Sequence, residues 1–203
     1  EVWRFASDER DFVNTLRRLG ESNGAVMARL GYMYSRGTSV ERNEAEGARW
    51  YKRGAEAGNH TSMIEYAFML FEGRGVDKNI PEGERYLRNA ANSGSILAMY
   101  RYALLLMDGK YVNKDQAQAV QFLKRAAEGM YAPAMNELGL AYANGTGVER
   151  NYAEALRWYE KAVNLNNAAA MVNMGILYQR GNGVEKNDTK AVEYYRRAAD
   201  LNQ

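Results

Sequence analysis

The sequence contains no cysteine, one histidine and two prolines among its 203 residues. The absence of cysteine excludes disulfides, cysteine-ligated zinc and thiol catalysis, and it fits a reducing and an oxidising compartment equally. Because His60 is the only histidine, a histidine-rich metal site and most catalytic triads are excluded as well. His60 lies in the stretch "AGNHTS", which predicts a solvated histidine in a turn.

Long apolar runs and a large net charge are also missing. The longest apolar runs, such as "YALLLM" at 102–107, fall far short of the roughly 20 residues that span a bilayer, so this segment is not expected to insert into a membrane. The 27 basic and 25 acidic residues give a net charge of +2, too small an excess to predict a nucleic-acid partner. A hydrophobic content of 46% beside 26% charged residues is typical of a soluble globular protein.

A period of 36 residues organises most of the chain. Five copies without a register slip predict a repeat protein, in which each unit buries its apolar face against its neighbours. The expected units are 24–59, 60–95, 96–131, 132–167 and 168–203. Three positions recur, a small residue, a loop glycine and an aromatic residue: Gly31, Ala67, Ala103, Gly139 and Gly175; Gly37, Gly73, Gly109, Gly145 and Gly181; Trp50, Tyr86, Phe122, Trp158 and Tyr194.

The first half of each unit is expected to form a helix. In "AMNELGLAY", the residues Met135, Leu138, Gly139 and Tyr142 fall at i, i+3, i+4 and i+7, on one helical face. Glycine inside a helix costs roughly 1 kcal/mol relative to alanine. The helical glycines therefore predict close approach of a partner helix, with Trp158 as the wedge against Gly139.

The second half of each unit is expected to form another helix. In "NYAEALRWYEKAV", Asn151 is the predicted N-cap and Glu154 its capping-box partner three residues later. Four of the five copies keep this pair, whereas Asn187 is followed by Lys190.

The loop between the two helices is rich in glycine, as in "GRGVDKN" at 73–79 and "GNGVEKN" at 181–187. Such loops cradle phosphates when they follow a buried strand and end in GK[ST], and this chain offers no strand-like stretch. A turn that the architecture requires recurs in every unit, whereas a ligand site need not. The glycines are therefore interpreted as helix–helix turns, and no cofactor is expected.

The repeated pattern resembles the Sel-1-like repeat, a relative of the tetratricopeptide repeat. The fourth unit carries it most fully, with "LG" at 138–139, "GTGV" at 145–148 and "WY" at 158–159, and Ser39 and Tyr111 depart from it by replacing the second loop glycine. The resemblance covers residues 25–203 and implies an all-α fold: a right-handed superhelical α-solenoid of five helix–loop–helix repeats.

Both ends of the chain lie outside this regular pattern. Residues 1–23 carry Phe12, Leu16 and Leu19 at helical spacing, which predicts an N-terminal capping helix or a degenerate half-repeat. The chain begins with Glu1 and shows no signal-peptide pattern, which predicts a processed protein or a fragment of a longer one. The last repeat has no polar cap, which predicts that the chain continues or that this end docks on another molecule, a second copy included.

A helical wheel assigns a third face to each first helix, beside its core face and its polar face. In the resembling repeats this face lines the concave surface and receives peptides or partner proteins. Six large apolar or aromatic residues gather there in the second and third units, and we expect a binding groove centred on Phe68, Phe71, Tyr100 and Leu104, unless neighbouring helices bury them. The candidate partner-binding residues are Tyr32, Ile64, Phe68, Phe71, Tyr100, Leu104, Met107, Asn136, Leu140 and Ile176.

The leading functional expectation is a non-catalytic scaffold that recruits a protein or peptide, with the resemblance extending to regulatory, secretory or envelope-associated assemblies. The alternatives are an enzyme acting on cell-wall or β-lactam substrates and a binder of cell-wall glycan or peptide, which would use platforms such as Tyr32 and Tyr100. The chain has no Ser-x-x-Lys pair and a single histidine, which disfavours the enzyme. The sequence predicts neither the partner nor the compartment.

Overall fold

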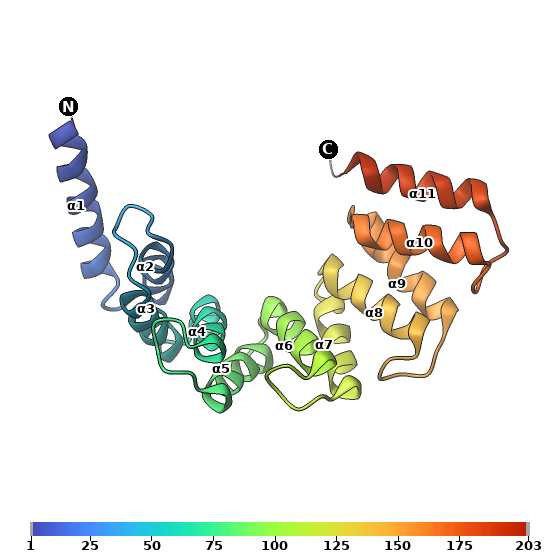
Figure 1. Ribbon diagram of the computed structural model, residues 1–203, viewed down its shortest axis with the longest axis horizontal. Helices are drawn as coiled ribbons and strands as arrows, with labels where there is room; N and C mark the ends of the chain where they lie inside the picture. The colour runs from blue at the N-terminus through green and yellow to red at the C-terminus, as the bar shows by residue number, and fades with distance from the viewer. Residues whose placement is uncertain (1, 202–203) are drawn as a thin grey trace. The chain divides into compact units, whose positions relative to one another are not determined.

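The computed structural model describes residues 2–201 and the side chains of residues 11–201, and every regular element in this range is an α-helix (Figure 1). The helices are α1 (Val2–Leu19), α2 (Gly24–Arg36), α3 (Glu44–Glu56), α4 (His60–Glu72), α5 (Ile80–Asn92), α6 (Ile96–Asp108), α7 (Gln116–Glu128), α8 (Ala132–Asn144), α9 (Tyr152–Asn164), α10 (Ala168–Arg180) and α11 (Asp188–Asp200).

The chain divides into two compact units, Glu1–Ala98 and Met99–Gln203, and the boundary falls within α6. In both units, consecutive helices pack as hairpins: α2 contacts α3 and α4 contacts α5 in the first, and α8 contacts α9 in the second. Figure 1 shows α10 and α11 side by side at the end of the second unit. These pairs are the helix–loop–helix repeats that the sequence predicts.

The second helix of each repeat is preceded by an N-cap residue whose side chain accepts a backbone hydrogen bond. The side chain of Asn151 accepts a hydrogen bond from the backbone N–H of Glu154, as predicted. Asn187 makes the same bond with the N–H of Lys190 at 2.9 Å, although the fifth repeat lacks the reciprocal glutamate. The fifth repeat therefore keeps its N-cap, because the hydrogen bond is accepted by the asparagine side chain and donated by a backbone N–H. The side chain of the residue three positions later is not needed for it.

The first helix of each repeat ends at the recurring loop glycine. Gly145 has a φ of +72°, in the left-handed region, and its N–H donates to the carbonyl of Ala141. Gly37, Gly73, Gly109 and Gly181 also have positive φ. Because only glycine enters this region without strain, these residues are helix C-caps, and the interpretation of the loops as turns is confirmed.

The second loop glycine contacts the preceding repeat. A Cβ on Gly147 would lie 2.2 Å from the carbonyl oxygen of Gln116, at the start of α7. A Cβ on Gly75 would lie equally close to the carbonyl oxygen of Glu44, at the start of α3. Loop and helix start are therefore in backbone contact, which sets the register of one repeat on the next.

The side chain that packs against the helical glycines is a tyrosine, and not the tryptophan that the sequence predicted. A Cβ on Gly139 would lie 2.6 Å from the ring of Tyr159, and the same relation joins Gly31 to Tyr51 and Gly175 to Tyr195. The prediction of close helix approach is confirmed, but the wedge against Gly139 was wrongly assigned to Trp158. Trp158 is half-buried, with the ammonium of Lys161 4.0 Å from its ring centre.

The other repeat aromatics pack against the core face of the first helix. Trp50 is buried in a cluster with Met27, Leu30 and Tyr34. Tyr194 stacks on Tyr178 with 5.8 Å between ring centres. The recurring aromatic residue therefore packs the two helices of a repeat together along a different face of the first helix from the one that contains the helical glycine.

The N-terminal helix α1 packs on α2 through a narrower face than expected. Leu16 packs against the cluster that contains Trp50, and Val13 is buried. Phe12 and Leu19, which the sequence placed on the same apolar face, are exposed. Within residues 2–201, no helix has the length and the apolar character needed to cross a bilayer.

Candidate functional site

The described residues contain no group of three or more histidine, cysteine, aspartate or glutamate side chains that could hold a metal ion. His60 is the first residue of α4 and half-buried, and does not lie in the turn where the sequence placed it.

Three of the predicted binding residues are buried. Ile64 and Phe71 on α4 are 2% and 0% exposed, and Asn136 on α8 is 6% exposed. The ring of Phe71 lies over Gly83 of α5, 2.8 Å from where a Cβ on that glycine would be. These side chains support the surface from beneath and cannot contact a partner directly, so the expectation of an open groove is not met at these positions.

The remaining predicted residues keep accessible area. Tyr32 is 43% exposed and Leu140 is 36% exposed. In the first unit Phe68 is half-buried, with its ring edge-to-face against Phe71 at 5.6 Å. In the second unit Tyr100, Leu104, Met107 and Ile176 are half-buried.

The first unit contains a pocket of about 390 Å³ beside Tyr32, within the size range of small-ligand sites. Ala28, Tyr32 and Ser35, at positions i, i+4 and i+7 on one face of α2, all line it. Ala28 makes room for the pocket, because the equivalent positions in the other repeats carry larger side chains. The other lining residues are Arg29, Arg36, Tyr51, Thr61, Glu65, Met69 and Arg74.

The charged residues that line the pocket are three arginines and one glutamate. The guanidinium of Arg29 lies 5.6 Å from the centre of the Tyr32 ring, a cation–π contact that holds both side chains at the rim. Arg36 ends α2, where a cation is favoured by the helix dipole. Sequence reasoning missed the pocket, although the small residue at position 28 and the arginines of the adjacent face were visible in it.

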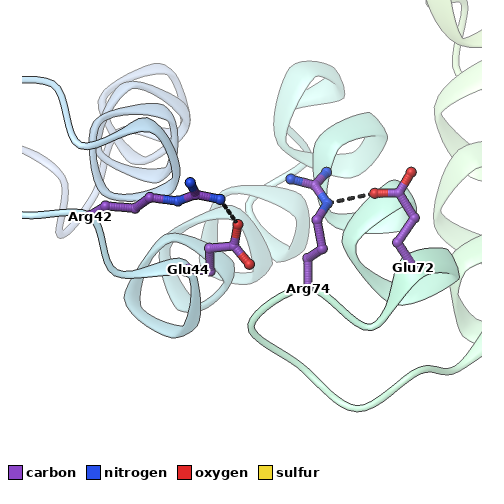
Figure 2. A network of polar contacts seen from close by, with 4 residues as sticks. All are labelled: Arg42, Glu44, Glu72 and Arg74. Atoms are coloured by element: carbon purple, nitrogen blue, oxygen red, sulfur yellow. Dashed lines mark hydrogen bonds and ion pairs between the residues drawn. The ribbon is translucent and has the colours of Figure 1, made fainter.

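Arg74, which lines the pocket, belongs to one of two neighbouring ion pairs (Figure 2). Its Nε lies 2.5 Å from a carboxylate oxygen of Glu72, and Arg42 makes an equally short contact with Glu44. The hydrogen bond from Arg42, together with the charges of Arg42 and Arg74, lowers the pKa of Glu44. The two arginines on either side of Glu44 therefore favour its ionised form.

Tyr51 forms the inner wall of the pocket. Its ring covers Gly31, and burial raises the pKa of its hydroxyl well above the usual value, with the nearby charge of Glu65 acting in the same direction. The hydroxyl is therefore protonated near neutral pH and can donate a hydrogen bond. With three arginines and one glutamate among its lining residues, the pocket carries an excess of positive charge.

The second unit carries a polar cluster on α8 and α10. The side-chain amide of Asn173 donates to Oδ1 of Asn136 at 2.8 Å, and the amide of Asn136 lies 3.3 Å from Oε1 of Glu137. Burial raises the pKa of the Glu137 carboxyl. Leu140, one turn further along α8, adds exposed apolar area beside this cluster.

The profile of the Sel1 repeat matches residues 24–59, 60–95, 96–129, 132–167 and 168–203. A search of curated proteins found no match. Among solved structures, the chain is similar to a Sel1 repeat protein from Oxalobacter formigenes, with 32% identity over 90% of this chain and 74% of that one and a TM-score of 0.81.

Two further structures are similar to this chain. One is a protective antigen present in uropathogenic Escherichia coli strains that displays an SLR fold, with 28% identity over 93% of this chain and a TM-score of 0.86. The match spans 40% of that antigen's length. The other is an immunity protein from Pseudomonas aeruginosa, 20% identical over 98% of this chain and 74% of that one with a TM-score of 0.60, which shares the fold.

Proposed function

Because the chain belongs to the Sel1 repeat family, whose members are generally non-catalytic protein–protein interaction scaffolds, we propose that each of its units binds a partner protein on the exposed faces of its first helices. The assemblies that this function would serve are regulatory, secretory or envelope-associated. The accessible apolar contacts would come from Tyr32 and Phe68 in the first unit and from Tyr100, Leu104, Met107, Leu140 and Ile176 in the second.

The pocket beside Tyr32 carries the proposal. Guanidinium groups bind carboxylates through paired, charge-assisted hydrogen bonds, and Arg29, Arg36 and Arg74 all line the pocket. Its chemistry therefore fits a carboxylate of the partner, either an aspartate or glutamate side chain or a chain end. Glu65 disfavours a second acidic group in the same place.

Selection from a random peptide library on the purified chain tests this function. We expect enrichment of peptides with an acidic residue, and we expect Arg36→Glu to weaken their binding by about tenfold or more, since a charge-assisted hydrogen bond is replaced by repulsion. Lys52→Glu is the matched control, because Lys52 is exposed in the same unit and does not line the pocket. Equal binding by both variants would contradict the carboxylate site.

The same assay separates the cell-wall alternatives. Soluble peptidoglycan fragments that displace no selected peptide support the protein scaffold. Binding of those fragments without any enriched peptide, or turnover of a reporter β-lactam, would replace it.

A further inference from the structure

Glu137 on α8 is a half-buried carboxylate without a cationic partner among the described residues. Its only polar contact in that range is the amide of Asn136, at 3.3 Å from Oε1. Burying a charge costs free energy unless a counter-charge or several hydrogen bonds compensate. One long hydrogen bond does not, and the raised pKa of Glu137 reflects the uncompensated burial.

Tyrosines from two neighbouring helices lie close to this carboxylate. Tyr100 on α6 precedes Glu137 by 37 residues, the separation at which Asn136 bonds to Asn173 across neighbouring first helices, and the ring of Tyr159 on α9 lies on Gly139, two residues after Glu137. Burial, together with the charge of Glu137, raises the pKa of both tyrosines. The ring of Tyr100 stands edge-to-face against Tyr131, with 5.2 Å between ring centres. Aromatic faces attract cations, and this attraction adds to that of a carboxylate.

The amides on α8 and α10 hold the carboxylate in place. Asn136 is buried and accepts a hydrogen bond from Asn173 at 2.8 Å, which orients its own amide group toward Glu137. The carboxylate is thus positioned by two adjacent repeats of the second unit, and its Oε2 has no partner among the described residues.

We propose that Glu137 and the ring of Tyr100 bind the cationic end of a lysine or arginine side chain of the partner segment. A bound cation would supply the missing counter-charge at the carboxylate, while the Tyr100 ring covers the methylene stem. The inference rests on the proposed peptide capture. It adds a site for a basic residue in the second unit to the arginine pocket in the first unit, which is proposed to bind an acidic residue.

The random peptide library tests the inference on the whole chain. We expect the enriched peptides to contain a basic residue, and we expect a synthetic copy with norleucine at that position to bind about tenfold more weakly. Glu137→Gln should remove this difference, because it keeps the shape and the Asn136 contact while removing the charge. Glu149→Gln, in an exposed loop, is the matched control and should keep it.

A second readout is the Glu137 carboxyl itself, followed by carbon-13 NMR as pH is varied. A bound lysine should lower its pKa, whereas the norleucine peptide should not. Enriched peptides whose basic residue matters equally in wild type and Glu137→Gln would overturn this inference and leave the proposed function standing. Failure to enrich any peptide would overturn both.

Discussion

The ring of Tyr159 lies directly on the backbone of Gly139, so close that a Cβ there would be 2.6 Å from it. The same two residue types face each other in the first and fifth repeats. In the second and third repeats the glycine position holds alanine and the tyrosine position holds leucine, at Ala67 with Leu87 and at Ala103 with Leu123. The size of one residue therefore follows the size of the other within the chain.

We expect Gly139→Ala to destabilise the protein although alanine favours helix. Overpacking of this kind costs roughly 1–3 kcal/mol, against a gain of about 1 kcal/mol in helix propensity. Urea unfolding followed by circular dichroism measures the change. An unchanged or raised midpoint would contradict the packing account.

Adding Tyr159→Leu to Gly139→Ala should recover stability, because the pair then matches that of the second and third repeats. Neighbouring residues of this kind couple by about 0.5–3 kcal/mol in double-mutant cycles. Tyr159→Leu alone should destabilise by leaving a cavity over the glycine. Additive effects of the two changes would show that the residues do not constrain each other.

Gly147→Ala should cost more than Gly145→Ala. Both have positive φ, a conformation that costs a non-glycine residue about 1 kcal/mol or more. In addition, the new Cβ at Gly147 meets the Gln116 carbonyl at 2.2 Å, whereas the nearest atom to one at Gly145 is 3.3 Å away on the Arg150 side chain. Thermal unfolding of the two variants compares them. Equal melting temperatures would argue against the inter-repeat contact.

Ala28→Ile should block the pocket beside Tyr32 without unfolding the first unit. The second repeat carries isoleucine at the equivalent position, Ile64, so the helix tolerates this side chain. Binding of a selected acidic peptide should fall about tenfold or more while the melting temperature is kept. Ala25→Ile, on an exposed part of the same helix, is the control and should bind normally.

Glu137→Gln should stabilise the protein at neutral pH. Burial raises the folded-state pKa of Glu137 above its ordinary value of 4.5, so the folded state disfavours the charged form. The contribution of Glu137 to the free energy of unfolding therefore falls as the pH rises from about 4.5 through the raised pKa. The glutamine side chain is neutral at every pH, so the Glu137→Gln variant does not lose this stability. Tyr100 and Tyr159, whose pKa values are raised by burial and by the charge of Glu137, stay protonated throughout.

Urea unfolding at pH 7 and pH 4 measures the effect. The advantage of Glu137→Gln over wild type should shrink at the lower pH, where the wild-type carboxyl is protonated. An advantage that is larger at pH 4 would reverse the sign and contradict a buried, disfavoured charge.

Helix positions were predictable because period and capping are local properties of the chain. The loop glycines and Asn151 mark helix ends through their own backbone chemistry, and the structure places them there. The partner of Gly139 was not predictable from one helical wheel, since Trp158 and Tyr159 both lie near the apolar stripe of α9. The comparison of repeats identifies the partner, because the glycine position pairs with tyrosine in three repeats and alanine at the same position pairs with leucine in the other two.

The binding surface was harder to predict, because exposure depends on what neighbouring helices contribute. Ile64 and Phe71 occupy the same wheel positions as Tyr100 and Met107 and are nevertheless buried. Gly83 leaves space on α5 that the Phe71 ring fills. Conversely, a pocket forms at Ala28 because a side chain is small there, which a search for large residues passes over.

The fit between Tyr159 and Gly139 also determines which repeats are interchangeable. A chimaera can join the first helix of the fourth repeat to the second helix of the first or the fifth repeat. This chimaera preserves the contact between a glycine and a tyrosine. Joining α4 to α9 would set a tyrosine against Ala67, and joining α8 to α5 would leave a void between Gly139 and Leu87. Five units of equal length thus fall into two classes by this residue pair, and we expect helix exchange within a class to preserve the fit and exchange between classes to disrupt it.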